Sequence, residues 1–126
     1  MGLDTSHGCW HGAYSAFMRW REKLCEVAGY GDIHKREGFA APNGKPRPVP
    51  WPEGDPLVIL LSHSDCEGEI ASADCEPIAN RLAELLPALE RAGDGYGHIQ
   101  SWADKTRLFI EGLRTAAGAG EDVEFM

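Results

Sequence analysis

Six prolines fall between Gly38 and Pro56 of this 126-residue chain. Each proline removes a backbone amide donor and fixes its own φ angle, so neither a helix nor a central strand can run through the stretch. The sequence therefore predicts a long proline-rich loop over 38–56, pinned to the surface by Trp51. Because a chain of this length encloses a single hydrophobic core, we expect one compact domain over 1–126.

Three stretches outside this loop carry apolar residues at helical spacing. Residues 12–28 make up the first stretch, and residues 99–117 make up the third. The second follows Ser72 or Asp74, either of which suits a helix N-cap, and Pro87 is expected to end or kink this helix. Helix therefore dominates the expected fold.

A short apolar run follows the prolines over 57–61, and its periodicity does not decide between strand and helix. Its β-branched pair favours a strand, whereas Asp55 and Pro56 resemble a helix N-cap followed by proline at the first helical position. We favour a strand that pairs with Val123 and Phe125. The expected fold class is therefore α+β, with about three helices, a small two-stranded element and a long proline-rich loop.

The chain is acidic, and the acid is unevenly placed. Its net charge is −8; residues 1–47 hold seven Lys/Arg against five Asp/Glu, whereas residues 48–126 hold five against fifteen. Such a surface repels nucleic acid and anionic membranes, and it favours cations or a basic protein partner. We therefore expect neither nucleic-acid nor membrane binding.

The N-terminus lacks the basic and apolar regions of a signal peptide, and no run approaches the roughly 18 apolar residues that span a bilayer. These features favour a cytoplasmic protein. None of the four cysteines belongs to a CxxC pair, so in a reducing compartment we expect thiols or metal ligands rather than disulfides. The motifs GxGxxG, GxxxxGK[ST] and GxSxG are absent, which favours a role other than catalysis.

The stretch from His63 to Asp74 reads HSDCEGEIASAD and resembles the twelve-residue calcium loop of EF-hand proteins. That loop takes oxygen ligands from its first, third, fifth and twelfth positions and has a glycine at the sixth for a sharp turn. Asp65, Glu67 and Gly68 fall in the third, fifth and sixth positions here, and Glu69 adds a further carboxylate. The resemblance implies a divalent-cation site in this loop.

Two departures from the EF-hand pattern weaken calcium binding. His63 stands where a carboxylate is expected, and Asp74 replaces the longer bidentate glutamate. Zinc or manganese is the alternative ion, because His63, Asp65 and Glu67 alternate and share one face of an extended backbone. The simplest competing interpretation is an acidic turn before a helix, with no ion at all.

A second group of candidate ligands, His7, Cys9 and His11, alternates in the same way near the N-terminus. Local capping and packing is the simpler interpretation of this group, and a site would require it to approach the acidic loop in space. A Cys9 thiolate activated by one of the histidines is the catalytic alternative. The aromatic residues Trp10, Tyr14, Phe17 and Trp20 are expected to contribute to the core rather than to stack on bases, and Trp10 and Trp20 are the two expected to be partly exposed.

Two segments taken together, SHGCWHGAYSAF over 6–17 and LLSHSDCEGEI over 60–70, resemble a family of small uncharacterised proteins from bacteria and their phages. The resemblance implies a prokaryotic or viral origin. It implies no particular activity, so the expected function depends on the residues themselves.

These features predict a non-enzymatic acidic binding protein that holds a divalent cation in the loop over 63–74, chiefly through Asp65, Glu67, Glu69 and Asp74. Two alternatives stay open. One is a bacterial or phage-encoded acidic inhibitor that occupies a basic groove on a host protein. The other is a small metal-dependent hydrolase, in which the N-terminal His/Cys group meets the acidic loop across one cleft.

Overall fold

The structure is a computed structural model, and it describes residues 2–37, 39, 48–93 and 101–126. Within these ranges the chain forms four α-helices, two single turns of 3₁₀ helix and four short strands. In chain order they are β1 (Gly2–Asp4), η1 (Ser6–Gly8), β2 (His11–Ala13), α1 (Tyr14–Val27), η2 (Ile33–Lys35), α2 (Leu57–Leu61), β3 (Glu69–Ile70), α3 (Ser72–Ala92), α4 (Trp102–Ala119) and β4 (Val123–Glu124).

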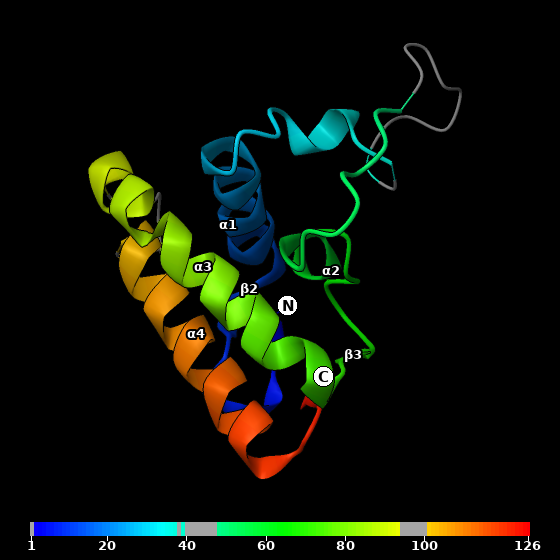
Figure 1. Cartoon of the computed structure of the whole chain (residues 1–126), viewed down its shortest axis with the longest axis vertical. Helices are drawn as coiled ribbons and strands as arrows, with labels where there is room; N and C mark the ends of the chain where they lie inside the picture. Colours follow the sequence, from blue (N-terminus) through cyan, green and yellow to red (C-terminus); the bar gives the residue numbers. More distant parts are fainter. Residues whose placement is uncertain (1, 38, 40–47, 94–100) are drawn as a thin grey trace.

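The two longest helices, α3 and α4, lie side by side along most of their length (Figure 1). The Ser101 hydroxyl caps α4 by accepting the Asp104 amide at 3.3 Å, and Gly120 ends the helix in the left-handed region at φ 69°. α3 does not end at Pro87 but continues to Ala92. Because Pro87 is exposed, its ring projects into solvent and does not disturb the core.

Helix α1 packs across the α3–α4 pair through aromatic side chains. Trp20 donates its indole N–H to the Thr106 hydroxyl at 2.9 Å, and its ring lies 4.8 Å from that of Phe109. Trp10 stacks 5.3 Å from Trp20, so both tryptophans are almost completely buried. The expectation that these two rings contribute to the core is therefore confirmed, whereas the expectation that they are partly exposed is wrong.

The apolar run over 57–61 is helix α2, and the preferred strand assignment is wrong. The Asp55 carboxylate accepts the Leu57 amide at 2.9 Å, so the helix-start signal outweighs the β-branched pair. The strand β4 pairs with β3 instead, with Ile70 opposite Val123. A second antiparallel pair, β1 with β2, forms at the N-terminus.

Together these elements confirm the α+β class, the three main helices and a small two-stranded antiparallel element. Within the described ranges, no helix is both long enough and apolar enough to cross a membrane. Much of the predicted proline-rich loop, residues 38 and 40–47, lies outside the described part of the chain, as does the start of the predicted third helix at Ile99. Trp51 is half-buried, and its indole donates to the Glu37 carbonyl at 3.0 Å.

A polar network joins the segment after α1 to α2 and α3. The Tyr30 hydroxyl donates to the Asp55 carboxylate, and Arg81 on α3 donates to both oxygens of that carboxylate at 3.3 and 3.2 Å. Burial raises the pKa of the Asp55 carboxyl, but the bonds from Tyr30, Leu57 and Arg81 outweigh burial and leave this pKa lowered. The network fixes the start of the turn that carries η2.

Candidate functional site

The loop predicted to bind a cation lies between α2 and α3, and its histidine is already engaged. In His63, Nδ1 lies 2.7 Å from the Ser64 carbonyl and Nε2 lies 3.0 Å from the Glu69 carbonyl. The ring also stacks 4.2 Å from the Phe125 ring. Because both ring nitrogens face backbone carbonyls of the loop, the ring would have to turn away from one of them before it could bind an ion.

The four carboxylates predicted as ligands are spread over different elements. Asp65 and Glu67 belong to the loop itself, Glu69 lies in β3 opposite Glu124, and Asp74 lies in the first turn of α3. Across residues 2–37, 39, 48–93 and 101–126, no three His, Cys, Asp or Glu side chains gather closely enough to hold a metal ion. The loop therefore presents carboxylates without a preformed cage.

The predicted N-terminal ligands point to separate partners. His7 Nε2 lies 3.0 Å from the Glu121 carboxylate, and His11 lies 3.6 Å from Asp4 on the neighbouring strand. Cys9 is buried, and burial raises the pKa of its thiol to about 12. A thiol with such a pKa holds its proton at neutral pH, which disfavours a nucleophilic role for Cys9.

Strand β4 and the residues beside it join the N-terminal segment to the acidic loop. The Phe125 amide donates to the Gly68 carbonyl at 2.9 Å, and Phe125 also forms a bridge with Thr5. The Glu124 amide donates to the Ser6 hydroxyl at 2.8 Å. The two predicted clusters thus lie at the same end of the molecule, with the C-terminal segment between them rather than a shared cleft.

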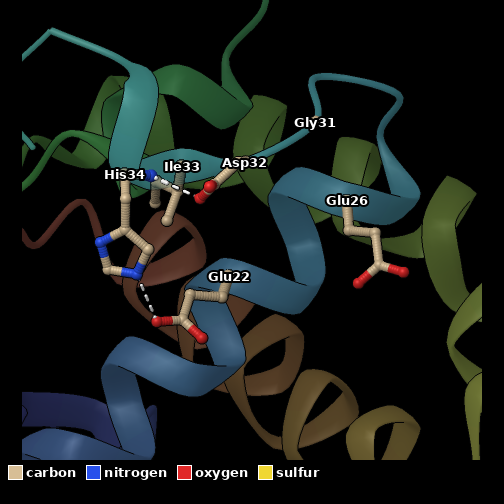
Figure 2. Close-up of a pocket in the computed structure, with 6 residues that line it drawn as sticks. All are labelled: Glu22, Glu26, Gly31, Asp32, Ile33 and His34. Atoms are coloured by element: carbon tan, nitrogen blue, oxygen red, sulfur yellow. Dashed lines mark hydrogen bonds and ion pairs between the residues drawn. The ribbon is translucent and has the colours of Figure 1, made fainter. Parts of the chain in front are cut away.

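A different place, not predicted from the sequence, concentrates acidic side chains around a hollow. A pocket of about 310 Å³ opens between α1 and the turn that carries η2 (Figure 2). α1 contributes two carboxylates, and the turn contributes a third carboxylate and an imidazole. Its lining consists of Glu22, Glu26, Gly31, Asp32, Ile33 and His34.

The geometry of this acidic pocket is set by the turn after α1. The Asp32 carboxylate accepts the His34 amide at 2.9 Å and so shapes the 3₁₀ turn. Ile33 is buried and anchors the turn in the core, while the His34 ring reaches back to the Glu22 carboxylate at 2.7 Å (Figure 2). Lys23 donates to Glu26 at 3.0 Å. The pocket therefore carries three carboxylates and one titratable ring.

One sequence signal for this pocket was available. Glu22 and Glu26 stand four residues apart on a helix, where like charges repel by a few tenths of a kcal/mol. The contact between Glu22 and His34 could not be predicted from the sequence. It depends on how the chain turns after α1, which no local pattern specifies.

Comparisons with known proteins find no protein family, no curated protein and no solved structure that matches this chain. The resemblance to a bacterial and phage family therefore stays a prediction, and the proposals below depend on the chain's own geometry and charge.

Proposed function

We propose that this chain is a non-enzymatic binding protein whose partner is a basic protein, and that the acidic pocket receives a lysine or arginine side chain of that partner. The observation that carries the proposal is the pocket of about 310 Å³ with carboxylates from Glu22, Glu26 and Asp32. The net charge of −8 supports it, because a field of this sign attracts basic partners before contact.

The lining of the acidic pocket suits both parts of a long basic side chain. Gly31 and the buried Ile33 leave room for the methylene stem, and the carboxylates accept the charged end group. Glu22 has His34 as its partner, and a guanidinium or ammonium group can replace the imidazole there. The pocket thus binds a cationic side chain without forming any new buried charge that lacks a partner.

The test is the affinity for a fluorescent tetra-arginine peptide at low salt, measured by anisotropy. The double variant Glu22→Gln, Asp32→Asn is expected to weaken binding by about 2- to 30-fold, since each of the two exposed ion pairs contributes roughly 0.2–1 kcal/mol. The matched control Glu53→Gln, Glu84→Gln removes the same charge from exposed positions outside the pocket and is expected to change affinity less than about twofold. Equal losses of affinity in both variants, or no binding of the peptide by the wild type, would contradict the proposal that this pocket binds a basic side chain.

A second candidate function is divalent-cation binding by the loop over 63–74, through Asp65, Glu67, Glu69 and Asp74. One observation favours it: Gly68, at the sixth position of the EF-hand pattern, adopts φ 92°, the left-handed turn for which that pattern uses glycine. Ligation by His63 would require its ring to release the Ser64 or Glu69 carbonyl.

Calcium, manganese and zinc are each titrated into chelator-treated protein, with heat and thermal unfolding as readouts. Stoichiometric binding that is lost in Asp65→Asn, Glu67→Gln but kept in Glu53→Gln, Glu84→Gln would support the loop. Cation binding that is equal in the two double variants would contradict a site in this loop. The same holds if the wild type shows neither a heat of binding nor a shift in its unfolding temperature.

A further inference from the structure

Within the described part of the chain, the outer face of the α3–α4 pair is not covered by the elements that bury its inner face. α1 packs against the inner face, where Trp20 meets Thr106 and Phe109. On the outer face a groove of about 600 Å³ follows the line between the two helices. Its lining comprises Ala83 and Leu86 from α3 and Arg107, Ile110, Glu111, Arg114 and Thr115 from α4.

This groove combines an apolar centre with charged ends. Ala83, Leu86 and Ile110 supply the centre. Toward one end Arg107 on α4 pairs with Glu90 on α3, and toward the other end Arg114 pairs with Glu76 at 3.8 Å. All four of these charged side chains are about half exposed, so they are accessible to a second molecule.

In the two ion pairs that join α3 to α4, the acids Glu76 and Glu90 lie on α3 and the bases lie on α4. α4 also carries two acids near these bases: Glu111, which lines the groove, and Asp104, which pairs with Arg107 at 3.0 Å. Arg107 and Arg114 are separated by seven residues, or about 10 Å along the helix. A surface that carries both signs in this arrangement can pair with a copy of itself, which is what a twofold interface requires.

Two twofold arrangements can stack one such face on another, and the charges distinguish them. With the axis parallel to the helices, α3 of one copy lies over α4 of the other at the same height, so Glu90 and Glu76 meet Arg107 and Arg114. With the axis across the helices, α3 lies over α3 with its ends exchanged, and Glu76 meets Glu90 of the other copy. The first arrangement pairs opposite charges, and the second juxtaposes like charges.

We propose that the outer face of α3 and α4 binds a second copy of this chain, giving a four-helix bundle about a twofold axis parallel to these helices. Helices of 21 and 18 residues offer a face roughly 30 Å long and 20 Å wide. Such a face buries on the order of 600 Å² per copy, somewhat below the roughly 800 Å² of a typical stable interface. Because this area is small, we expect a reversible dimer rather than a permanent one. This inference goes beyond the proposed function, since the acidic pocket shares no residue with the groove.

The test uses two charge-reversed variants and their mixture. Arg107→Glu, Arg114→Glu makes the face wholly acidic at these positions, and Glu76→Arg, Glu90→Arg makes it wholly basic. Sedimentation equilibrium is expected to show a concentration-dependent dimer for the wild type and a monomer for each variant alone. An equimolar mixture is expected to form a heterodimer, identified by its mass in native mass spectrometry, because each acidic position then meets a basic one.

Far-ultraviolet circular dichroism checks that each variant is folded. Glu37→Arg, Glu53→Arg serves as a control with reversed charges at exposed positions outside the groove. The control is expected to dimerise at least as strongly as the wild type. A wild type that stays monomeric up to about 500 µM overturns the proposal. A homodimer that persists in both reversed variants, or folded variants whose mixture stays monomeric, also overturns it.

Discussion

Gly112 lies where α4 passes beneath the N-terminal segment, and the contact leaves no room for a side chain. A Cβ added there would stand 2.5 Å from Cys9 Sγ and 2.9 Å from the His7 carbonyl oxygen. We therefore expect Gly112→Ala to lower the free energy of unfolding by about 1–3 kcal/mol, because overpacking displaces the backbone around Cys9. Urea denaturation followed by tryptophan fluorescence measures the change.

The same helix provides a matched control. Gly118 is exposed, and a Cβ added there meets nothing within 4 Å. Gly118→Ala is expected to leave stability unchanged or to raise it by up to about 1 kcal/mol, since alanine is the better helix former. Equal effects of the two substitutions would show that the close approach at Gly112 is not what limits stability.

Single residues also show how far the sequence predicts the candidate sites. The alternation of His63, Asp65 and Glu67 could be recognised in the sequence. The backbone carbonyls that contact the His63 ring could not be predicted. One of them is the carbonyl of Glu69, and the ring reaches it only because Gly68 turns the chain back. The residue types show which functional groups are available, whereas the hydrogen-bond partners of these groups depend on how the loop folds.

At the scale of elements, Asp55 is the residue on which several segments depend. It accepts the Leu57 amide at the start of α2, and it joins Tyr30 to Arg81 on α3. We expect Asp55→Asn to lower the free energy of unfolding by about 1.5–3 kcal/mol at neutral pH, because bonds from three donors to a charged acceptor are weakened. Glu84→Gln is the control: Glu84 contacts the same Arg81 at 3.7 Å from an exposed position, and its loss is expected to cost under about 1 kcal/mol.

The pH dependence of this difference has a defined sign. The pKa of the Asp55 carboxyl is lowered in the folded state relative to about 3.9 in the unfolded chain. Its contribution is therefore complete above about pH 4 and is lost as pH falls through the folded-state pKa. The stability gap between wild type and Asp55→Asn should narrow below about pH 4, and a gap that stays constant down to acid unfolding would contradict the lowered pKa.

The long helices were predictable because each repeats its apolar pattern over several turns. The run over 57–61 was not, since a single turn is too short for periodicity to decide. Its conformation depends on Asp55, whose second role in the network with Tyr30 and Arg81 arises only after the chain has folded. Pro87 was expected to end or kink this helix, and only the first alternative is wrong, since α3 continues to Ala92.

At the scale of the whole molecule, the C-terminal segment joins parts of the chain that are far apart in sequence. Val123 pairs with Ile70, Phe125 bridges to Thr5, and the Met126 amide donates to the Asp4 carbonyl at 2.8 Å. No local pattern in a stretch of a few residues predicts which strand it will meet. The sequence accordingly predicted the pairing element at the C-terminus but assigned it the wrong partner.

These long-range contacts predict how fast each of the four thiols reacts with a thiol reagent. Cys66 is exposed, whereas Cys9, Cys25 and Cys75 are buried, and burial raises the pKa of all three buried thiols. With an excess of an aromatic disulfide reagent, we expect one thiol per chain to react quickly. The other three should react together and more than about 10³-fold slower, through global unfolding.

Mass spectrometry of digested samples assigns each modified cysteine, and Cys66→Ser should abolish the fast phase alone. Fast labelling of Cys9 with Cys25 and Cys75 still protected would mean that the N-terminal segment opens by itself, despite the Met126 and Phe125 contacts that hold it. Such a result would separate the stability of that segment from that of the helical core. Labelling of all three buried thiols at one slow rate would instead establish that the termini and the helices unfold as a single cooperative unit.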